Sequence, residues 1–267
     1  MTISNVILIV DDDPAIRDSL SKELRAAGYA TTTAADGSEG MRAFQSQVPD
    51  LVLTDSLMGS LDGKVAVVTG ASQGIGHAIA EGLDAEGAQI VVADLRGAEE
   101  AAQAFDDGVG LTVDVSKEAD VQRMAEETVT RCGGIDILVN NAGLYASLAM
   151  RPFEQIPLDE WRQVMDVNVA SMFLTCRAVV PVMREQGGGR IVNISSGTPF
   201  RGVPFLLHYV TSKGAIVALT RALAKEVGAD GVLVNCVAPG FTMSEGVLEH
   251  PEVVEALRDV SVWRRGP

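Results

Sequence analysis

The sequence predicts an α/β protein whose larger part is a doubly wound parallel sheet, with a shorter α/β segment ahead of it. Short apolar runs rich in β-branched residues alternate with helical patterns, and such continuous runs suit strands that are buried on both faces. Repeated alternation of strand and helix then implies parallel strands joined by right-handed crossovers. The expected strands are Val65–Val68, Ile90–Ala93, Leu111–Val113, Ile137–Val139, Ile191–Ile194 and Val232–Val237.

The helices between these runs are predicted from spacing and from end signals. Apolar residues at helical spacing from Ile75 to Leu83 predict a helix, which Gly87 can end in a left-handed turn. Asp159 is expected to be the N-cap of a later helix that carries Trp161.

Composition bounds the function. Apolar residues make up 47% of the 267 residues and charged residues 21%, which is ordinary for a globular protein. A net charge of −15 argues against nucleic acid and anionic membranes as partners, because both need a basic face. No apolar run reaches the roughly 18 to 20 residues that span a bilayer, and the N-terminus lacks the basic leader of a signal peptide. Three scattered cysteines, Cys132, Cys176 and Cys236, are expected to be reduced thiols of a cytoplasmic protein.

The first 59 residues also show an alternation of predicted strands and a helix, over a shorter length. Strands are expected at Val6–Val10, near Ala30–Thr33 and at Leu51–Thr54, with a helix that starts at Pro14 and ends before Gly28. The turn-rich stretch around Gly59 marks a junction, so we expect two domains, residues 1–59 and residues 60–267.

A glycine-rich turn, Thr69 to Gly76, follows the first strand of the larger segment and opens a helix. Without Cβ atoms, such a turn can bring backbone N–H groups against a pyrophosphate, and the helix N-terminus favours negative charge. The strand–turn–helix context therefore favours a dinucleotide site over the alternative of close helix–strand packing alone.

Asp94 ends the second apolar run. A carboxylate there can accept hydrogen bonds from the adenosine ribose hydroxyls and would repel a 2′-phosphate. Gln73 is neutral where a basic side chain could hold that phosphate, and Arg96 lies nearby but outward. These residues favour NAD over NADP as the cofactor, and a simple turn role for Asp94 is the alternative.

Tyr209 and Lys213 lie one helical turn apart and so share one face of the predicted helix. An ammonium beside a phenol would stabilise the phenolate and suit a general acid/base. Ser196 follows the strand Ile191–Ile194, where a hydroxyl faces the crevice in which such sheets bind ligands.

From Leu61 onward the chain resembles the short-chain dehydrogenase/reductase family in the order and spacing of its motifs. The matching pieces are Thr69–Gly76, Asp94, Asp114-Val115, Asn140-Asn141-Ala142-Gly143, Asn168, Ser196, Tyr209, Lys213 and Asn235 through Pro239-Gly240. The resemblance implies a Rossmann-like sheet, which in this chain lacks its final strand, and an NAD(H)-dependent oxidoreductase that interconverts a secondary alcohol and a ketone. A 3-oxoacyl group is one option for that ketone.

The resemblance also implies the residue roles. Tyr209 exchanges the proton with the substrate oxygen, Lys213 lowers the pKa of Tyr209 and holds the nicotinamide ribose, Ser196 binds the substrate oxygen, and Asn168 anchors a water that passes protons to solvent. The implied cofactor-binding residues are Gly70, Gln73, Gly74, Ile75, Gly76, Asp94, Asp114, Val115, Asn141, Ala142, Gly143, Tyr209, Lys213, Pro239, Gly240 and Thr242. Ser244 stands where the family often has threonine, so Thr242 is a second candidate for holding the carboxamide.

Residues 1–59 resemble the first half of a flavodoxin-like response-regulator receiver domain. Asp11 and Asp12 follow its first strand and Asp55 follows its third, so the resemblance implies a vestigial Mg²⁺ site with Asp55 as phospho-acceptor. The strands expected to carry the family's hydroxyl and lysine are missing, and we expect no working metal site.

Three functions are weighed. The leading one is the dehydrogenase, acting on a small alcohol or ketone. The rivals are a phosphorylation-regulated signalling module and an inactive chimera that only binds dinucleotide.

The C-terminus stops at what resembles the start of a further helix. Elements that often form the family's oligomer interface are therefore expected to be absent, and a homo-oligomer is left open. Leu144, Tyr145, Phe205 and Leu206 are expected either to line an apolar substrate pocket or to pack as core and lid.

Overall fold

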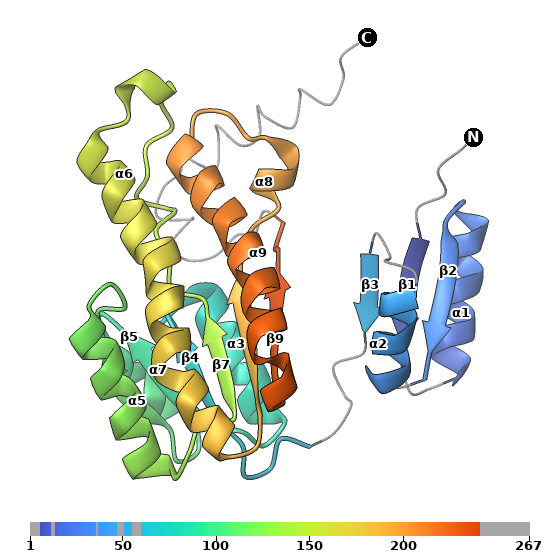
Figure 1. Cartoon of the computed structure of the whole chain (residues 1–267), viewed down its shortest axis with the longest axis horizontal. Coiled ribbons are helices and arrows are strands. Elements are labelled where there is room, and N and C mark those ends of the chain that lie inside the picture. Colours follow the sequence, from blue (N-terminus) through green and yellow to red (C-terminus); the bar gives the residue numbers. More distant parts are fainter. Residues whose placement is uncertain (1–5, 12–13, 36, 47–50, 55–59, 241–267) are drawn as a thin grey trace. The chain divides into compact units, whose positions relative to one another are not determined.

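The computed structural model of the protein describes residues 6–11, 14–35, 37–46, 51–54 and 60–240. The chain divides into two compact units, Met1–Ser60 and Leu61–Pro267. Each unit holds its own parallel sheet, with strand orders β2-β1-β3 and β6-β5-β4-β7-β8-β9 (Figure 1). Both are α/β units, as the sequence predicts.

The first unit is a three-stranded sheet with two helices. Its elements are β1 (Val6–Val10), α1 (Pro14–Ala26), β2 (Ala30–Ala34), α2 (Gly37–Ser46) and β3 (Leu51–Thr54). The small core of this unit is formed by Leu8, Val10 and Ala34, with Ala43 packed against them. Asp11 is buried directly after β1, whereas Asp12 and Asp55 lie outside the described residues.

The second unit begins with three strands and the helices that connect them. These elements are β4 (Val65–Thr69), α3 (Gly74–Ala85), β5 (Gln89–Asp94), α4 (Ala98–Ala101), a short 3-10 turn (Ala102–Ala104), β6 (Val109–Thr112) and α5 (Glu118–Cys132). β6 starts earlier than the apolar run Leu111–Val113 suggests, because Val109 and Gly110 pair in parallel with Val91 and Val92.

The chain then returns to the other side of β4. The elements are β7 (Ile137–Asn140), a 3-10 turn (Phe153–Gln155), α6 (Leu158–Met165), a π-helical turn (Asp166–Ala170), α7 (Ser171–Glu185), β8 (Gly189–Ile194), α8 (Thr198–Arg201), α9 (Leu207–Val227), a 3-10 turn (Gly228–Asp230) and β9 (Val232–Val237). Asp159 is not the N-cap of α6: the cap position is Pro157, and Asp159 lies inside the first turn. A proline before the helix fixes the entry of the chain, and this outweighs the capping preference of the later aspartate.

Two apolar layers cover the sheet of the second unit. One face packs against α5, α7 and α9 through a core that includes Met124, Val179 and Met183. The opposite face packs against α3 and α4 through a core that includes Ala80 and Phe105. This is the doubly wound arrangement, with strands buried on both sides.

The continuous helical stretch Leu158–Glu185 is long and apolar enough, by composition, to cross a membrane. Two of its buried polar side chains, Asn168 and Thr175, are hydrogen-bonded to neighbouring segments of the unit. Helix α7 also contributes Val179 and Met183 to the core beneath the sheet. Packing in the core of the second unit therefore explains why this helical stretch is so apolar.

Glycine in β6 sets how closely α4 approaches the sheet, and this yields a stability prediction. A Cβ on Gly110 would lie 2.4 Å from the Cα atom of Glu99 and 2.5 Å from the carbonyl oxygen of Ala98. Gly110→Ala should therefore lower the free energy of unfolding by about 1–3 kcal/mol, the usual effect of overpacking. Gly82→Ala is the matched control, because nothing lies within 4 Å of that Cβ on α3, and it should stabilise by about 0.5–1 kcal/mol.

Urea unfolding followed by tryptophan fluorescence checks this prediction, since both tryptophans, Trp161 and Trp263, belong to the second unit. An unfolding midpoint for Gly110→Ala equal to that of the parent would contradict the packing argument.

Candidate functional site

The candidate site forms where the strand order of the second unit reverses. The chain runs outward from β4 through β5 to β6 and then returns to β7 on the other side of β4. All of these strands are parallel, so their carboxyl ends share one edge of the sheet. Ligands of open α/β sheets bind in the crevice at such a reversal.

The glycine-rich turn lies between β4 and α3, as the sequence predicts. Gly70 and Gly74 have φ of +64° and +63°, which only glycine adopts without strain. A Cβ on Gly76 would lie 2.2 Å from the carbonyl oxygen of Gly70, so glycine is also needed for α3 to start this close to the strand. Gln73, the N-cap residue of α3, makes no side-chain capping bond. The turn thus presents backbone and an uncapped helix N-terminus, a combination that suits a pyrophosphate.

A clamp joins the ends of β4 and β7. The Thr69 hydroxyl accepts hydrogen bonds from the backbone N–H groups of Asn141 (3.0 Å) and Ala142 (3.1 Å). In return, the Asn141 side-chain amide donates to the carbonyl oxygens of Thr69 (3.0 Å) and Gly70 (2.9 Å). The segment from Asn141 to Gly143 is therefore held against the glycine turn from the neighbouring strand.

Asp94 lies at the end of β5, beside this turn. Its Oδ2 accepts hydrogen bonds from the backbone N–H (3.0 Å) and hydroxyl (2.7 Å) of Ser72. Its Oδ1 is 3.4 Å from the backbone N of Arg96. The carboxylate is thus fixed next to the glycine-rich turn, at the carboxyl end of β5.

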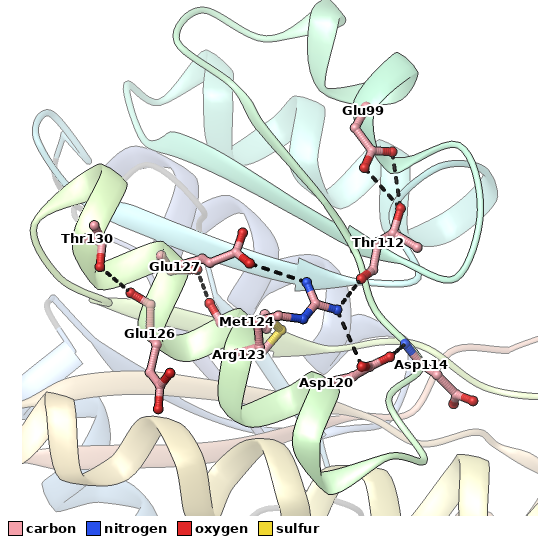
Figure 2. A network of polar contacts seen from close by, with 10 residues as sticks. Glu99, Thr112, Asp114, Asp120, Arg123, Met124, Glu126, Glu127 and Thr130 are labelled. Atoms are coloured by element: carbon pink, nitrogen blue, oxygen red, sulfur yellow. Dashed lines mark hydrogen bonds and ion pairs between the residues drawn. The ribbon is translucent and has the colours of Figure 1, made fainter.

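Asp114 follows β6 and is held by a polar network that Figure 2 shows. Its backbone N–H donates to Asp120 (3.0 Å; Figure 2). The carboxylate of Asp114 accepts hydrogen bonds from the backbone and hydroxyl of Ser116. The bond from the Asp114 N–H is also the main reason why the pKa of Asp120 is lowered. Arg123 completes the network through the carbonyl oxygen of Thr112. The Val115 side chain is buried in the sheet core, so only its backbone can face a ligand.

Ser196, Tyr209 and Lys213 come together at the end of β8. Ser196 lies two residues beyond the last residue of β8, and Tyr209 and Lys213 lie on one face of α9, where all three are at least 90% buried. Burial raises the pKa of the Tyr209 phenol, and the Ser196 side chain acts on it in the opposite direction. The Lys213 ammonium lies 5.7 Å from the centre of the Tyr209 ring and donates to the carbonyl oxygen of Ile194 (2.9 Å).

The lowering of the Tyr209 pKa by Lys213 stays a prediction, and the structure adds the effect of burial. The pKa of Tyr209 is raised to about 12, mainly by burial; Ser196 opposes this rise and the nearby Tyr145 adds to it. Burial lowers the pKa of Lys213 to about 8. Desolvation therefore favours the neutral form of both groups.

Asn168 is a junction between three segments. It lies in the π-helical turn and is fully buried. Its side chain accepts from the N–H of Leu144 (2.7 Å) and donates to the carbonyl oxygen of Leu144 (3.2 Å) and the hydroxyl of Ser212 (3.0 Å). The asparagine thus ties the loop after β7 to α9. Single π turns within helices often occur at functional sites.

The remaining predicted residues flank this centre. The Tyr145 ring packs against the Tyr209 ring, with 4.8 Å between ring centres. Leu206 is buried and Leu144 half-buried, both in the cluster around Tyr209, while Phe205 is exposed. The Pro239 carbonyl oxygen accepts a hydrogen bond from Gly197, next to Ser196. Thr242 and Ser244 lie outside the described residues.

Several residues of the site escape sequence reasoning. Thr69 and Ser72 use their hydroxyls to hold Asn141 and Asp94, and the only available hint is that both belong to the glycine-rich turn. Ser195 anchors α9 by donating to the carbonyl oxygen of Lys213 (2.7 Å). Within the described parts of the chain no cluster of three or more metal-ligating side chains occurs, and all three cysteines are free thiols.

Comparison with known families identifies both units. The short chain dehydrogenase family matches residues 64–252, and the response regulator receiver domain matches residues 7–69. The first match spans well over half of the chain.

Individual relatives agree with the first match. The chain is 36% identical to D-beta-hydroxybutyrate dehydrogenase of Rhizobium meliloti over 68% of its length and 72% of the relative. It is 36% identical to a 3-oxoacyl-[acyl-carrier-protein] reductase of Haemophilus influenzae over 77% of its length and 86% of the relative. D-threitol dehydrogenase of Mycolicibacterium smegmatis is 41% identical, with coverages of 69% and 72%.

A solved structure is similar in fold as well as in sequence. The 3-ketoacyl-(acyl-carrier-protein) reductase of Brucella melitensis, complexed with NADH, superposes with a TM-score of 0.68 at 33% identity. The match covers 71% of this chain and 80% of that one. These similarities support an alcohol or ketone oxidoreductase that uses a nicotinamide dinucleotide and acts on small molecules. With its glycine turn, its clamp and its Ser–Tyr–Lys cluster on a doubly wound sheet, this chain belongs to the short-chain dehydrogenase family.

Proposed function

We propose that the chain interconverts a secondary alcohol and a ketone with NAD(H), and that Tyr209 is the general acid/base. The observation that carries the proposal is the convergence of Ser196, Tyr209 and Lys213 beside the glycine-rich turn, at the carboxyl ends of adjacent parallel strands. Residues 60–267 would suffice for this site, since every described member of it belongs to the second unit. The receiver-domain match of residues 7–69 favours the signalling rival, but no described residue of this site belongs to the first unit.

The residues of the crevice fit a dinucleotide. The glycine turn, Gly70 to Gly76, would hold the pyrophosphate, and Asp94 would accept hydrogen bonds from the adenosine ribose. Asp114 and the Val115 backbone would flank the adenine, and the segment Asn141–Gly143 would line the cofactor. Thr242 stays a predicted contact. The bound nicotinamide supplies the hydride, and the protein supplies orientation and proton transfer.

The protein groups would act on the substrate oxygen as follows. Ser196 donates a hydrogen bond to the carbonyl oxygen, which orients the ketone. Tyr209 gives its phenolic proton to the same oxygen as negative charge develops there. Burial keeps the phenol protonated at neutral pH, which suits an acid in the direction of ketone reduction. Lys213 would bind the nicotinamide ribose, and Asn168 would anchor the water that returns the proton.

The substrate class follows from the chemistry of the site and from the relatives. All of the quoted relatives act, by their names, on hydroxy or oxo compounds. We therefore propose a secondary alcohol or its ketone, with a 3-oxoacyl group as the first compound to test. An intracellular, cytoplasmic enzyme is consistent with three free thiols.

Removing the proposed acid is the first test. Tyr209→Phe keeps the ring and removes only the proton donor, so kcat should fall by at least about 100-fold, the lower bound for a positioned acid. Its NADH affinity should be unchanged in a fluorescence titration, whereas Lys213→Ala should lose both kcat and affinity. Tyr29→Phe is the control, since it removes a phenol in the first unit, to which no described member of the site belongs. Substantial ketone reduction by Tyr209→Phe would refute the mechanism.

Asp94 provides the second test. A like charge about 4 Å away is unfavourable by about 1–4 kcal/mol in a protein surface environment. Asp94→Ser should therefore tighten NADPH binding by at least about fivefold, while the parent prefers NADH. Asp106→Ser removes the same charge from an exposed position and should leave the preference unchanged. A parent protein that binds NADPH as tightly as NADH would show that the role given to Asp94 is wrong.

The buried lysine predicts how stability depends on pH. The pKa of Lys213 is about 8 in the folded protein and 10.5 ordinarily, so between these values the unfolded chain binds a proton that the folded chain has released. The free energy of unfolding contributed by Lys213 therefore rises with pH from about 8 to about 10.5, and is lost as pH falls through 8. Tyr209 acts oppositely, but only above pH 10, its ordinary pKa.

Urea unfolding at a series of pH values between about 7 and 9.5 measures this effect. The parent should gain stability relative to Lys213→Met, which keeps the aliphatic stem without the charge. Parallel stability curves for the two proteins would mean that the lysine is not desolvated.

A further inference from the structure

Three polar side chains, Arg151, Glu160 and His208, are linked by hydrogen bonds and join three segments of the second unit. The last of them, His208, directly precedes Tyr209 in the sequence. The His208 imidazole is fully buried, and its Nε2 lies 3.0 Å from Oε1 of Glu160 on α6. The other carboxylate oxygen of Glu160 accepts a hydrogen bond from Arg151 Nη2 (3.2 Å). Glu160 and Arg151 are each only partly exposed. The carboxylate therefore bridges a surface-facing guanidinium and a buried imidazole.

The contact with Glu160 indicates which ring nitrogen of His208 carries a proton. A carboxylate only accepts hydrogen bonds, so the proton of the imidazole lies on Nε2 and is donated to Glu160. His208 Nδ1 is buried without a partner. A second proton there would be a buried donor without an acceptor. The negative charge of Glu160 is balanced by Arg151.

The start of α9 depends on contacts of this kind. Its N-cap residue, Leu206, makes no side-chain capping bond, and the preceding Phe205 has a φ of +67°, which is uncommon for a bulky residue. The backbone N–H of Arg151 donates to the Phe205 carbonyl oxygen (2.9 Å) and so holds this segment from outside the helix. Arg151 thus holds the residue before the N-cap of α9, and His208 holds the first turn of the helix, which carries Tyr209.

We propose that the Arg151–Glu160–His208 chain positions Tyr209, with His208 as the positioning residue. It would fix the first turn of α9 and the end of the loop after β7, which also supplies Tyr145 and Leu148 to the cluster around Tyr209. The inference rests on the proposed role of Tyr209 for its effect on rate. The claim that these residues fix the position of the Tyr209 ring does not depend on that role.

The chain offers a matched pair of variants to test this. His208→Gln keeps an N–H donor near the Nε2 position, whereas His208→Leu keeps the volume without the donor. The full chain contains three tyrosines, so 3-fluorotyrosine labelling gives three fluorine NMR signals, and Tyr209→Phe assigns the one from Tyr209. His208→Leu should shift or broaden this signal and leave that of Tyr29 unchanged. His208→Gln should restore the parent spectrum.

Kinetics should follow the spectra. With NADH and a 3-oxoacyl thioester, His208→Leu should lower kcat by about 10- to 100-fold, the scale expected for a misplaced reacting group. NADH affinity and KM should change little, and His208→Gln should recover most of kcat. A folded His208→Leu with an unchanged Tyr209 signal and unchanged kcat would overturn the proposal, even if its unfolding midpoint were lower.

A folding failure of His208→Leu does not end the test. Glu160 lies nearer the surface, and Glu160→Leu removes the acceptor from His208, so it should perturb the same signal. Glu160→Gln keeps an acceptor oxygen and should perturb it less. A parent that reduces no ketone would refute the proposed function, while the fluorine spectra would still decide on the positioning of Tyr209.

Discussion

The clamp between Thr69 and Asn141 is the interaction on which the rest of the site depends. β4 and β7 are neighbours in the sheet although α3, β5, β6 and α5 separate them in the chain. The clamp joins their carboxyl ends through four hydrogen bonds, two accepted by the Thr69 hydroxyl and two donated by the Asn141 amide. The glycine turn and the Asn141–Gly143 segment are thereby held against each other at one edge of the sheet. Parallel strands bring these ends to one edge, and the clamp fixes how they meet.

The proton-transfer side of the crevice is anchored separately. Ser195 and Lys213 each make a hydrogen bond between the end of β8 and α9, and Asn168 links α9 to the loop after β7. Nearly all of the groups involved are buried, and buried polar networks of this kind fix a unique geometry only when they are satisfied. Tyr209 is thus held by a helix whose position is set from the sheet, from the π-helical turn and from the His208 side.

The architecture, the glycine-rich turn and the charged residues of the site could be predicted from the sequence. The hydrogen bonds that hold them in place could not. The β-branched runs give the strands, because burial on both faces leaves a continuous apolar pattern. Asp94, Tyr209 and Lys213 could be chosen because their spacing from the strands and from each other carries chemical meaning. Ser72, Ser195 and Glu160 could not, since a hydroxyl or carboxylate acquires its role only from a partner distant in the chain. The burial that raises the pKa of Tyr209 could not be predicted either, because a separation of one helical turn from Lys213 does not reveal how deeply the two side chains are buried.

The central claim is that this crevice transfers a hydride to a ketone whose oxygen is protonated by the protein. Deuterium tracing tests it most directly. The full chain is incubated with NADH that carries deuterium at the transferable position and with a 3-oxoacyl thioester, and the product is examined by mass spectrometry. The account predicts an alcohol with one deuterium on the carbinol carbon for each NADH consumed. Consumption of NADH without deuterated alcohol, or no reaction with any ketone, would contradict it.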